Sequence, residues 1–241
     1  MKKYEPCSHC HNGWKYRSDK NGEETAIKCS CLIKYQKEES IRIKLEKANI
    51  STKALNFNLK ETYIGPDDDG NIAKLQKYIT QFKDKYRKIS LYLWSEQNST
   101  QKTTVASIIG KELIVKGFKV RLILMDTLIK LLQDASFDKD KEALLLDYSN
   151  ADLLIIDDCF DKAKMTVYKS GYQFAFIDSF LRHRLEVATK ATIFTSNVCP
   201  TTIGQSFNIS IEKLINRNVY PMEFKDSVEL RNDFNPEDIW E

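Results

Sequence analysis

The sequence lacks a long apolar run and a strong net charge, and it has little glycine. Its 241 residues include eight glycines, and 37 basic side chains stand against 34 acidic ones, a formal charge of +3. No apolar stretch approaches the roughly 18 residues that span a bilayer, and the start leads into no apolar signal region. We therefore expect a cytoplasmic protein without a membrane partner. An apolar fraction of 42% excludes wholesale disorder.

Charge and cysteine are both unevenly distributed. Residues 1–60 carry 13 basic and 7 acidic side chains, a net of +6, so the remainder carries 24 against 27, a net of −3. Four of the six cysteines lie in the first 31 residues. A boundary is expected near residues 50–65. We assign residues 1–50 to a small module with a linker helix, and residues 51–241 to a larger domain.

The N-terminal cysteines have the spacing of a zinc site. The pattern is Cys-x-x-Cys, eighteen residues, then Cys-x-Cys, and its members are Cys7, Cys10, Cys29 and Cys31. Two such pairs let four thiolates hold one tetrahedral ion, and metal is favoured over disulfides in a cytosolic chain. His9 and His11 are substitute ligands. Four unrelated buried thiols are the alternative, and we read Cys159 and Cys199 as packing residues.

Between the two cysteine pairs the sequence predicts a β-hairpin. Residues 13–16 and 25–28 have strand composition and flank a turn at 19–22. So small a segment has little core, and a structural zinc would supply folding free energy. A charged helix is expected over 32–49. The basic side chains of this helix either contact DNA phosphates or form a solvent-exposed face. They are Lys34, Lys37, Arg42, Lys44 and Lys47.

The larger part alternates short apolar runs with helical stretches. The apolar runs are 89–94, 120–125, 153–157 and 191–196. The helical stretches are 103–116, 126–136 and 172–188. Strands that alternate with helices pair in parallel through right-handed crossovers, which predicts an α/β sandwich. Ligands of such sheets bind at the carboxyl ends of the strands.

The residues after the first run are similar to a degenerate phosphate-binding loop. Lys102 and Thr103 match the end of G-x-x-x-x-G-K-[ST], but Glu96 and Gln101 replace both glycines. Such a loop binds phosphate through backbone N–H groups and a helix N-terminus, and a left-handed residue other than glycine costs about 1–2 kcal/mol. A coincidental Lys-Thr is the alternative, and an inward Glu96 would repel phosphate. The expected nucleotide contacts are Asn98, Ser99, Thr100, Gln101, Lys102, Thr103, Thr104 and Asp157.

Two later strands end in polar groups. The run 153–157 ends in Asp157 and is followed by Asp158, a pattern in which the first acid organises Mg²⁺ and the second orients the attacking water. Thr103 would share the magnesium ion with Asp157. The alternative is a buried strand followed by a helix-capping aspartate. The run 191–196 is followed by Asn197, which could hydrogen-bond a γ-phosphate or the water.

Taken together, these motifs resemble the helicase-loader branch of the AAA+ ATPases, the DnaC/DnaI-like replication proteins, and especially versions carried by phages and mobile elements of Gram-positive bacteria. The resemblance covers nearly the whole chain and includes the cysteine segment with Gly13 and Trp14, residues 151–158 and the triplet 195–197. It implies an AAA+ (P-loop) parallel-sheet sandwich without a helical lid, preceded by a small zinc-binding module. It also implies a trans-acting arginine finger, Arg217, before a last strand at 219–224.

The resemblance further implies ATP, Mg²⁺ and Zn²⁺ as cofactors. The implied partners are single-stranded DNA, a hexameric DnaB-type helicase and other copies of the chain in an open ring or spiral. Because the loop glycines are missing, we expect nucleotide binding with weak hydrolysis. A non-hydrolysing helicase adaptor and a transposition helper ATPase resembling IstB are the alternatives, distinguished by turnover assays and by whether a helicase or a transposase is the bound partner.

Overall fold

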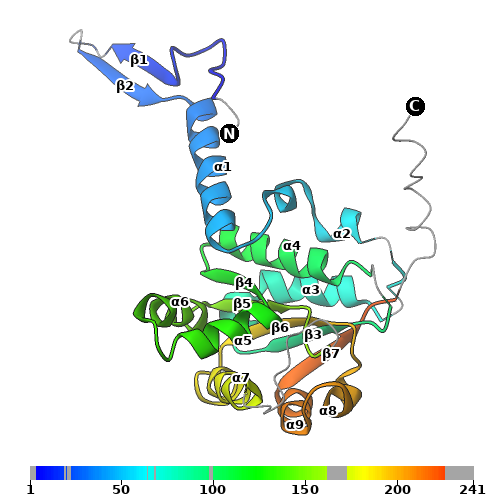
Figure 1. The fold of residues 1–241 in the computed structure, drawn as a ribbon. Helices are drawn as coiled ribbons and strands as arrows, with labels where there is room; N and C mark the ends of the chain where they lie inside the picture. Colours follow the sequence, from blue (N-terminus) through cyan, green and yellow to red (C-terminus); the bar gives the residue numbers. More distant parts are fainter. Residues whose placement is uncertain are drawn as a thin grey trace, which may run out of the picture.

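The computed structural model describes residues 4–18, 20, 23–63, 65–67, 69–97, 100–161 and 173–225. Figure 1 shows a small hairpin carried on a long helix, and beneath it a layered body in which helices cover both faces of one sheet. The predicted α/β sandwich is therefore confirmed. None of the described helices is long and apolar enough to cross a bilayer.

The body is built on a five-stranded sheet in the order β4-β5-β6-β3-β7, and all neighbouring strands are parallel. Its strands are β3 (Ser90–Trp94), β4 (Val120–Leu124), β5 (Leu153–Asp157), β6 (Ala191–Ser196) and β7 (Val219–Glu223). Both central strands β5 and β6 are buried along their whole length, which is why they read as continuous apolar runs. The predicted strand at 120–125 ends one residue early because Met125 begins a helix.

One face of the sheet is covered by the end of the first long helix and by three others. They are α1 (Ser30–Lys47), α2 (Leu59–Thr62), α3 (Asn71–Thr80) and α4 (Lys102–Val115), with a 3₁₀ turn at Thr52–Asn56 after α1 and a π-helical turn at Phe82–Tyr86 after α3. Leu45 in α1 and the following Ala48 and Ile50 belong to the core that these helices form with the sheet. The C-terminal end of α1 is thus part of the body.

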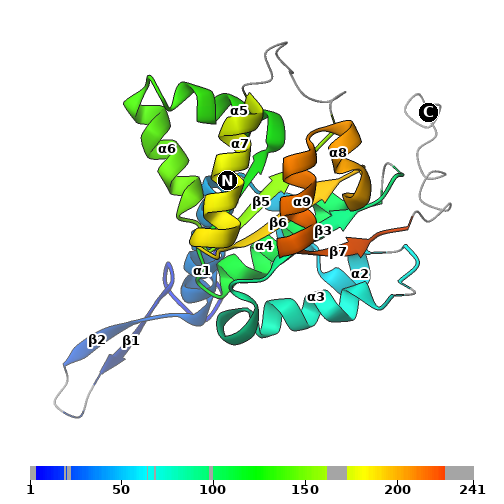
Figure 2. The ribbon, with the colours of Figure 1, turned by 90° about the horizontal axis from the view of Figure 1, so that it is seen from below.

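The other face is covered by the remaining helices, which Figure 2 shows lying across the sheet. They are α5 (Met125–Asp134), α6 (Lys139–Ser149), α7 (Gln173–Arg182), α8 (Ile203–Ser206) and α9 (Ile209–Asn218), with a π-helical turn at His183–Val187 after α7 and a 3₁₀ turn at Pro200–Thr202. The helix α6 was not predicted. Its three leucines are consecutive rather than helically spaced, and it is fixed instead by Asp138, whose carboxylate accepts the N–H groups of Asp140 and Lys141.

The hairpin consists of β1 (Trp14–Ser18) and β2 (Glu24–Lys28), which pair antiparallel as predicted. Every residue of both strands is exposed, so the hairpin has no core of its own. Asp19, Asn21 and Gly22 of the predicted turn lie outside the described residues, as do residues 226–241, on which the predicted absence of a lid depends.

Candidate functional site at the carboxyl edge of the sheet

The loop after β3 keeps a glycine-type backbone without glycine. Gln101, directly before α4, is left-handed with φ +59°, which costs a side-chain-bearing residue about 1–2 kcal/mol. Its side-chain amide donates to the carbonyl oxygen of Thr62 at 3.0 Å, which fixes the residue against the preceding segment. The predicted contacts Asn98 and Ser99 lie outside the described residues.

Lys102 is folded into this loop. Its Nζ donates to Thr100 Oγ1 at 2.7 Å and to the carbonyl oxygen of Gln97 at 3.2 Å, and the side chain is buried. Lys102 also begins α4, whose first N–H groups and dipole favour an anion at the same place. The half-buried Thr104 follows in the first turn. An ammonium group and a helix N-terminus therefore meet in one loop, the arrangement that binds phosphate.

A hydroxyl and a carboxylate lie together beside the loop. Asp157, buried at the end of β5, accepts a hydrogen bond from Thr103 Oγ1 at 2.8 Å and another from the Thr195 hydroxyl on β6. Hard oxygen ligands of this kind suit Mg²⁺. The structure thus brings together the two residues predicted to hold magnesium, and the donor set fits that ion. The hydrogen bond that the Thr195 hydroxyl donates to Asp157 was not predicted from the sequence.

Asp158 and Asn197 lie at the same edge. Asp158 is exposed and left-handed with φ +54°, and its backbone N–H donates to Thr195 Oγ1 at 3.2 Å. Asn197 directly follows β6, the neighbour of β5. Among the described residues, Asp157 is bound by the hydroxyls of Thr103 and Thr195, and Asp158 lies in a left-handed backbone conformation directly after it.

Glu96 directly precedes Gln97, whose carbonyl oxygen accepts a hydrogen bond from Lys102 Nζ. Glu96 lines a hollow of about 410 Å³ at the ends of β3 and β7, together with Gln97, Glu223, Phe224 and Lys225. This hollow therefore adjoins the loop, and its two carboxylates disfavour phosphate inside it.

Arg217 lies at the opposite edge of the same chain. It is exposed in the last turn of α9, directly before β7 begins, whereas the loop follows the end of the adjacent strand β3. Five strand residues span about 16 Å. Arg217 is therefore separated from the loop after β3 of its own chain by about the length of the sheet.

The four N-terminal cysteines form one cluster, and all their sulfur atoms lie within 4.8 Å of one another. The Sγ–Sγ distances are 3.6 Å for Cys7–Cys10, 3.7 Å for Cys7–Cys29 and 3.5 Å for Cys10–Cys31. Four thiolates about 2.3 Å from a tetrahedral zinc ion are about 3.8 Å apart. The cluster therefore fits zinc without rearrangement. His9 and His11 are exposed and do not belong to it.

The local fold explains the shorter second cysteine pair. Cys29 is buried directly before α1 and Cys31 lies in its first turn, where the helix dipole stabilises thiolate. A hydrogen bond with the Tyr4 hydroxyl, 3.2 Å away, is the main cause that lowers the pKa of Cys31 to about 6. Gly13 has φ +89°, and a Cβ there would lie 2.6 Å from the Tyr4 hydroxyl and 2.8 Å from Leu32. Only glycine fits at this position of the cluster.

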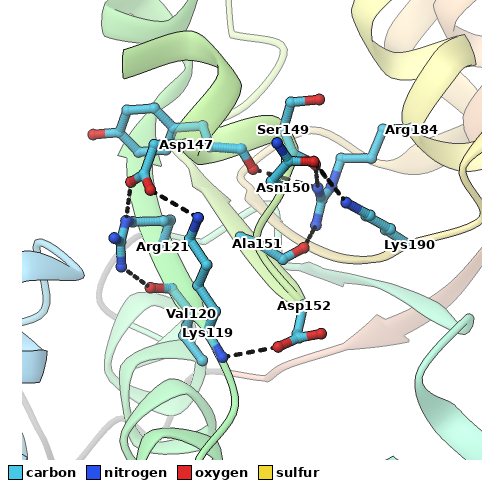
Figure 3. Close-up of polar contacts among 11 residues, drawn as sticks. Lys119, Val120, Arg121, Asp147, Ser149, Asn150, Ala151, Asp152, Arg184 and Lys190 are labelled. Atoms are coloured by element: carbon cyan, nitrogen blue, oxygen red, sulfur yellow. Dashed lines mark hydrogen bonds and ion pairs between the residues drawn. The ribbon is translucent and has the colours of Figure 1, made fainter. Parts of the chain in front are cut away.

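Sequence reasoning missed Arg184, a buried cation at the other edge of the sheet. Its guanidinium donates to Thr192 Oγ1 and to the carbonyl oxygens of Tyr148, Ser149, Ala151 and Ala191. Figure 3 shows it beside Lys190, which donates to the same segment. Burial lowers the pKa of Arg184 to about 10, so it stays charged at neutral pH. Arg184 lies in a helical stretch with nothing in its sequence pattern to distinguish it from a surface arginine, so only the tertiary structure shows its contacts.

No family model and no curated protein matches this chain in sequence. In fold, it is similar to the crystal structure of DnaI, with a TM-score of 0.60 and 17% identity over 73% of this chain and 95% of that chain. It is also similar to the crystal structure of the DnaC helicase loader. The TM-score is 0.56 and the identity 17%, over 73% of this chain and 100% of that chain. A third similar structure is the replication initiator DnaA bound to AMPPCP and single-stranded DNA. Its TM-score is 0.58 and its identity 13%, over 74% of this chain and 51% of that chain. The body therefore has the predicted AAA+ fold.

Proposed function

We propose that this chain is an ATP-dependent loader that places a DnaB-type replicative helicase on single-stranded DNA, in the replication of a phage or mobile element. The observation that carries the proposal is the contact between Thr103 and Asp157 beside the buried Lys102, at the edge where parallel sheets bind ligands. The similarity in fold to structures titled DnaI, DnaC helicase loader and DnaA bound to single-stranded DNA supports the replication context.

The residues of the carboxyl edge take separate roles in this proposal. Lys102 and the N-terminus of α4 hold the phosphates, and Thr103 and Asp157 hold Mg²⁺, which supplies charge neutralisation on the phosphate oxygens. Asp158 orients the attacking water and Asn197 senses the γ-phosphate. Arg217 completes the site of a neighbouring copy, so the active form is an assembly of chains in an open ring or spiral.

A non-hydrolysing adaptor remains the second candidate, because Gln101 holds a strained backbone where the loop motif has glycine. Turnover of ATP is measured with single-stranded DNA and helicase for the wild type and for Asp158→Asn. We expect slow turnover that Asp158→Asn lowers by at least about tenfold while ATP binding stays within about twofold. Helicase loading with undetectable turnover would instead establish the adaptor, and recovery of a transposase in place of a helicase would overturn the loader.

The role of Arg217 is tested by mixing. Arg217→Ala removes the finger, and Lys102→Ala removes phosphate binding, so each variant alone is expected to lose turnover. Mixed assemblies pair an intact Lys102 loop with an intact Arg217 of the next copy and should recover part of the activity. Absence of any recovery, with assembly shown intact, would argue against the action in trans.

The zinc module is proposed to hold the helicase. Metal analysis should give about one zinc per chain, and Cys7→Ser with Cys10→Ser should lose the metal. Cys199→Ser, which changes a half-buried thiol in the body, is the matched control and should keep it. A Cys7 and Cys10 variant that retains full zinc would refute this ligand set.

A further inference from the structure

The amino edge of the sheet is basic. Basic residues stand just before four of the five strands, and they are Arg87 and Lys88 before β3, Lys116 and Lys119 before β4, Lys190 before β6, and Arg217 before β7. Of the acidic residues at this edge, Asp152 binds Arg87 and the backbone N–H of Lys119. The buried charge of Arg184 lies behind them.

The basic residues border a hollow of about 240 Å³ where α1 meets β4. Lys44 and Lys47 of α1 form one wall, and Lys119 and Arg121 form the other. The floor is apolar, made by Ile114, Phe118 and Val120. Four cations thus line one hollow with an apolar floor.

The two walls are held in register by hydrogen bonds. The backbone N–H of Leu122 donates to the carbonyl oxygen of Ala48 at 2.8 Å, so the residues after α1 pair with β4. Asn49 donates from its side chain to the carbonyl oxygen of Leu122 at 3.3 Å and to the Tyr148 hydroxyl at 2.8 Å. Since Ala48 is buried as well, the lysines of α1 are fixed relative to those of β4.

The cations of the hollow are only partly neutralised. Asp147 binds both Lys119 and Arg121, as Figure 3 shows. Neither Lys44 nor Lys47 forms an ion pair with any of the described residues. Two of the four basic side chains that line the hollow therefore share one acid, and the other two have no ion-pair partner among the described residues. Beyond the hollow, burial followed by the charge of Arg184 lowers the pKa of Lys190, as expected at a positively charged edge.

The structure separates the cations of α1 into two groups. Lys34 lies within 4.0 Å of Glu38, and Arg42 binds Glu46, both as pairs along the exposed helix. Lys44 and Lys47 instead face the hollow in the last turn. Of the five cations on which the sequence left a DNA-binding face undecided, these two have a receptive surface beside them.

We propose that this hollow and the adjoining amino edge bind the sugar–phosphate backbone of single-stranded DNA. Cations over an apolar floor suit phosphate with sugar, and none of the residues that line the hollow carries a side-chain amide or carboxylate to read bases. The inference rests on the proposed loader function, of which it names the DNA-contacting surface. That surface lies across the sheet from the nucleotide loop.

The test uses the full zinc-loaded chain and a fluorescent oligothymidine of about 20 nucleotides, with binding measured by anisotropy over a series of salt concentrations. The variant is Lys44→Gln with Lys47→Gln. The control is Lys34→Gln with Lys37→Gln, which removes the same charge from the same helix. Loss of two phosphate contacts should weaken binding by about tenfold near 0.1 M salt and lower the salt slope by about 1.4. The control should stay within about twofold.

A second variant changes the affinity in the opposite direction. Asp147→Asn removes the acid that neutralises Lys119 and Arg121, so binding of the oligonucleotide should tighten by about threefold. Wild-type affinity in both the Lys44/Lys47 and Asp147 variants would overturn the proposed surface while leaving the loader function standing. Binding that depends on Lys44 and Lys47 without any helicase loading would retain the surface and refute the loader.

Discussion

The two edges of one parallel sheet differ in charge and in backbone. At the carboxyl edge, Asp157, Asp158, Glu96 and Glu223 gather, and left-handed residues are held in turns. At the amino edge the side chains are mainly basic, and the strands begin against a network of hydrogen bonds to Arg184 (Figure 3). The carboxyl edge thus gathers acidic side chains beside the buried Lys102, whereas the amino edge is mainly basic.

This difference shows how one fold separates a chemical site from a stabilising one. The strain at Gln101 persists because the surrounding structure fixes it. Arg184 has the opposite effect, since its guanidinium binds carbonyl oxygens at the end of α6, just before β5 and at the start of β6. Substitution of the buried Arg184 should therefore lower the free energy of unfolding.

The largest effect is expected for Arg184→Met. It leaves several buried carbonyl oxygens unsatisfied, at about 1–3 kcal/mol each, so the free energy of unfolding should fall by about 3–5 kcal/mol. Urea denaturation measures this. Arg182→Met, two residues away in a partly exposed ion pair with Asp178, should cost less than about 1 kcal/mol. Equal losses in the two variants would contradict the assigned role of Arg184.

An intermediate effect is expected at Gln101. Gln101→Gly relieves the left-handed strain but loses the bond to Thr62, so stability should stay within about 0.5 kcal/mol of the wild type. Gln101→Ala keeps the strain without the bond and should be about 1–2 kcal/mol less stable than the glycine variant. Thermal denaturation compares the two. If alanine and glycine were equally tolerated, the left-handed backbone at this position would be wrong.

The smallest effect concerns Asp147. Burial opposes its ionisation, but the hydrogen bonds from Arg121 and Lys119 prevail and lower its pKa below the usual value. A depressed pKa gives stability that is present above about pH 4 and lost as the pH falls through the folded value. Asp147→Asn should thus cost less than about 1 kcal/mol at pH 7, and the difference from the wild type should shrink as the pH falls below about 4. A difference that persists in acid would point to packing.

The sequence predicted the sheet closely because β5 and β6 are buried on both faces and therefore appear as uninterrupted apolar runs. The cysteine cluster was equally visible, since its ligands are near one another in sequence. Arg184 could not be found in this way: it lies in a helical stretch like any surface arginine, and its acceptors come from α6, β6 and the loop before β5. Which of Lys34 and Lys44 lines the hollow likewise depends on which turn of α1 meets β4.

The attachment of α1 to β4 also has a mechanical consequence. The helix has 18 residues and is about 27 Å long. It is fixed to the body at its C-terminal end, while its N-terminal end carries the cysteine cluster and the hairpin (Figure 1). A rotation of β4 by 10° would swing the far end of a straight α1 through about 5 Å. Because the hydrogen bond between Leu122 and Ala48 attaches the C-terminal end of α1 to β4, a small movement of β4 would produce a larger displacement at the hairpin.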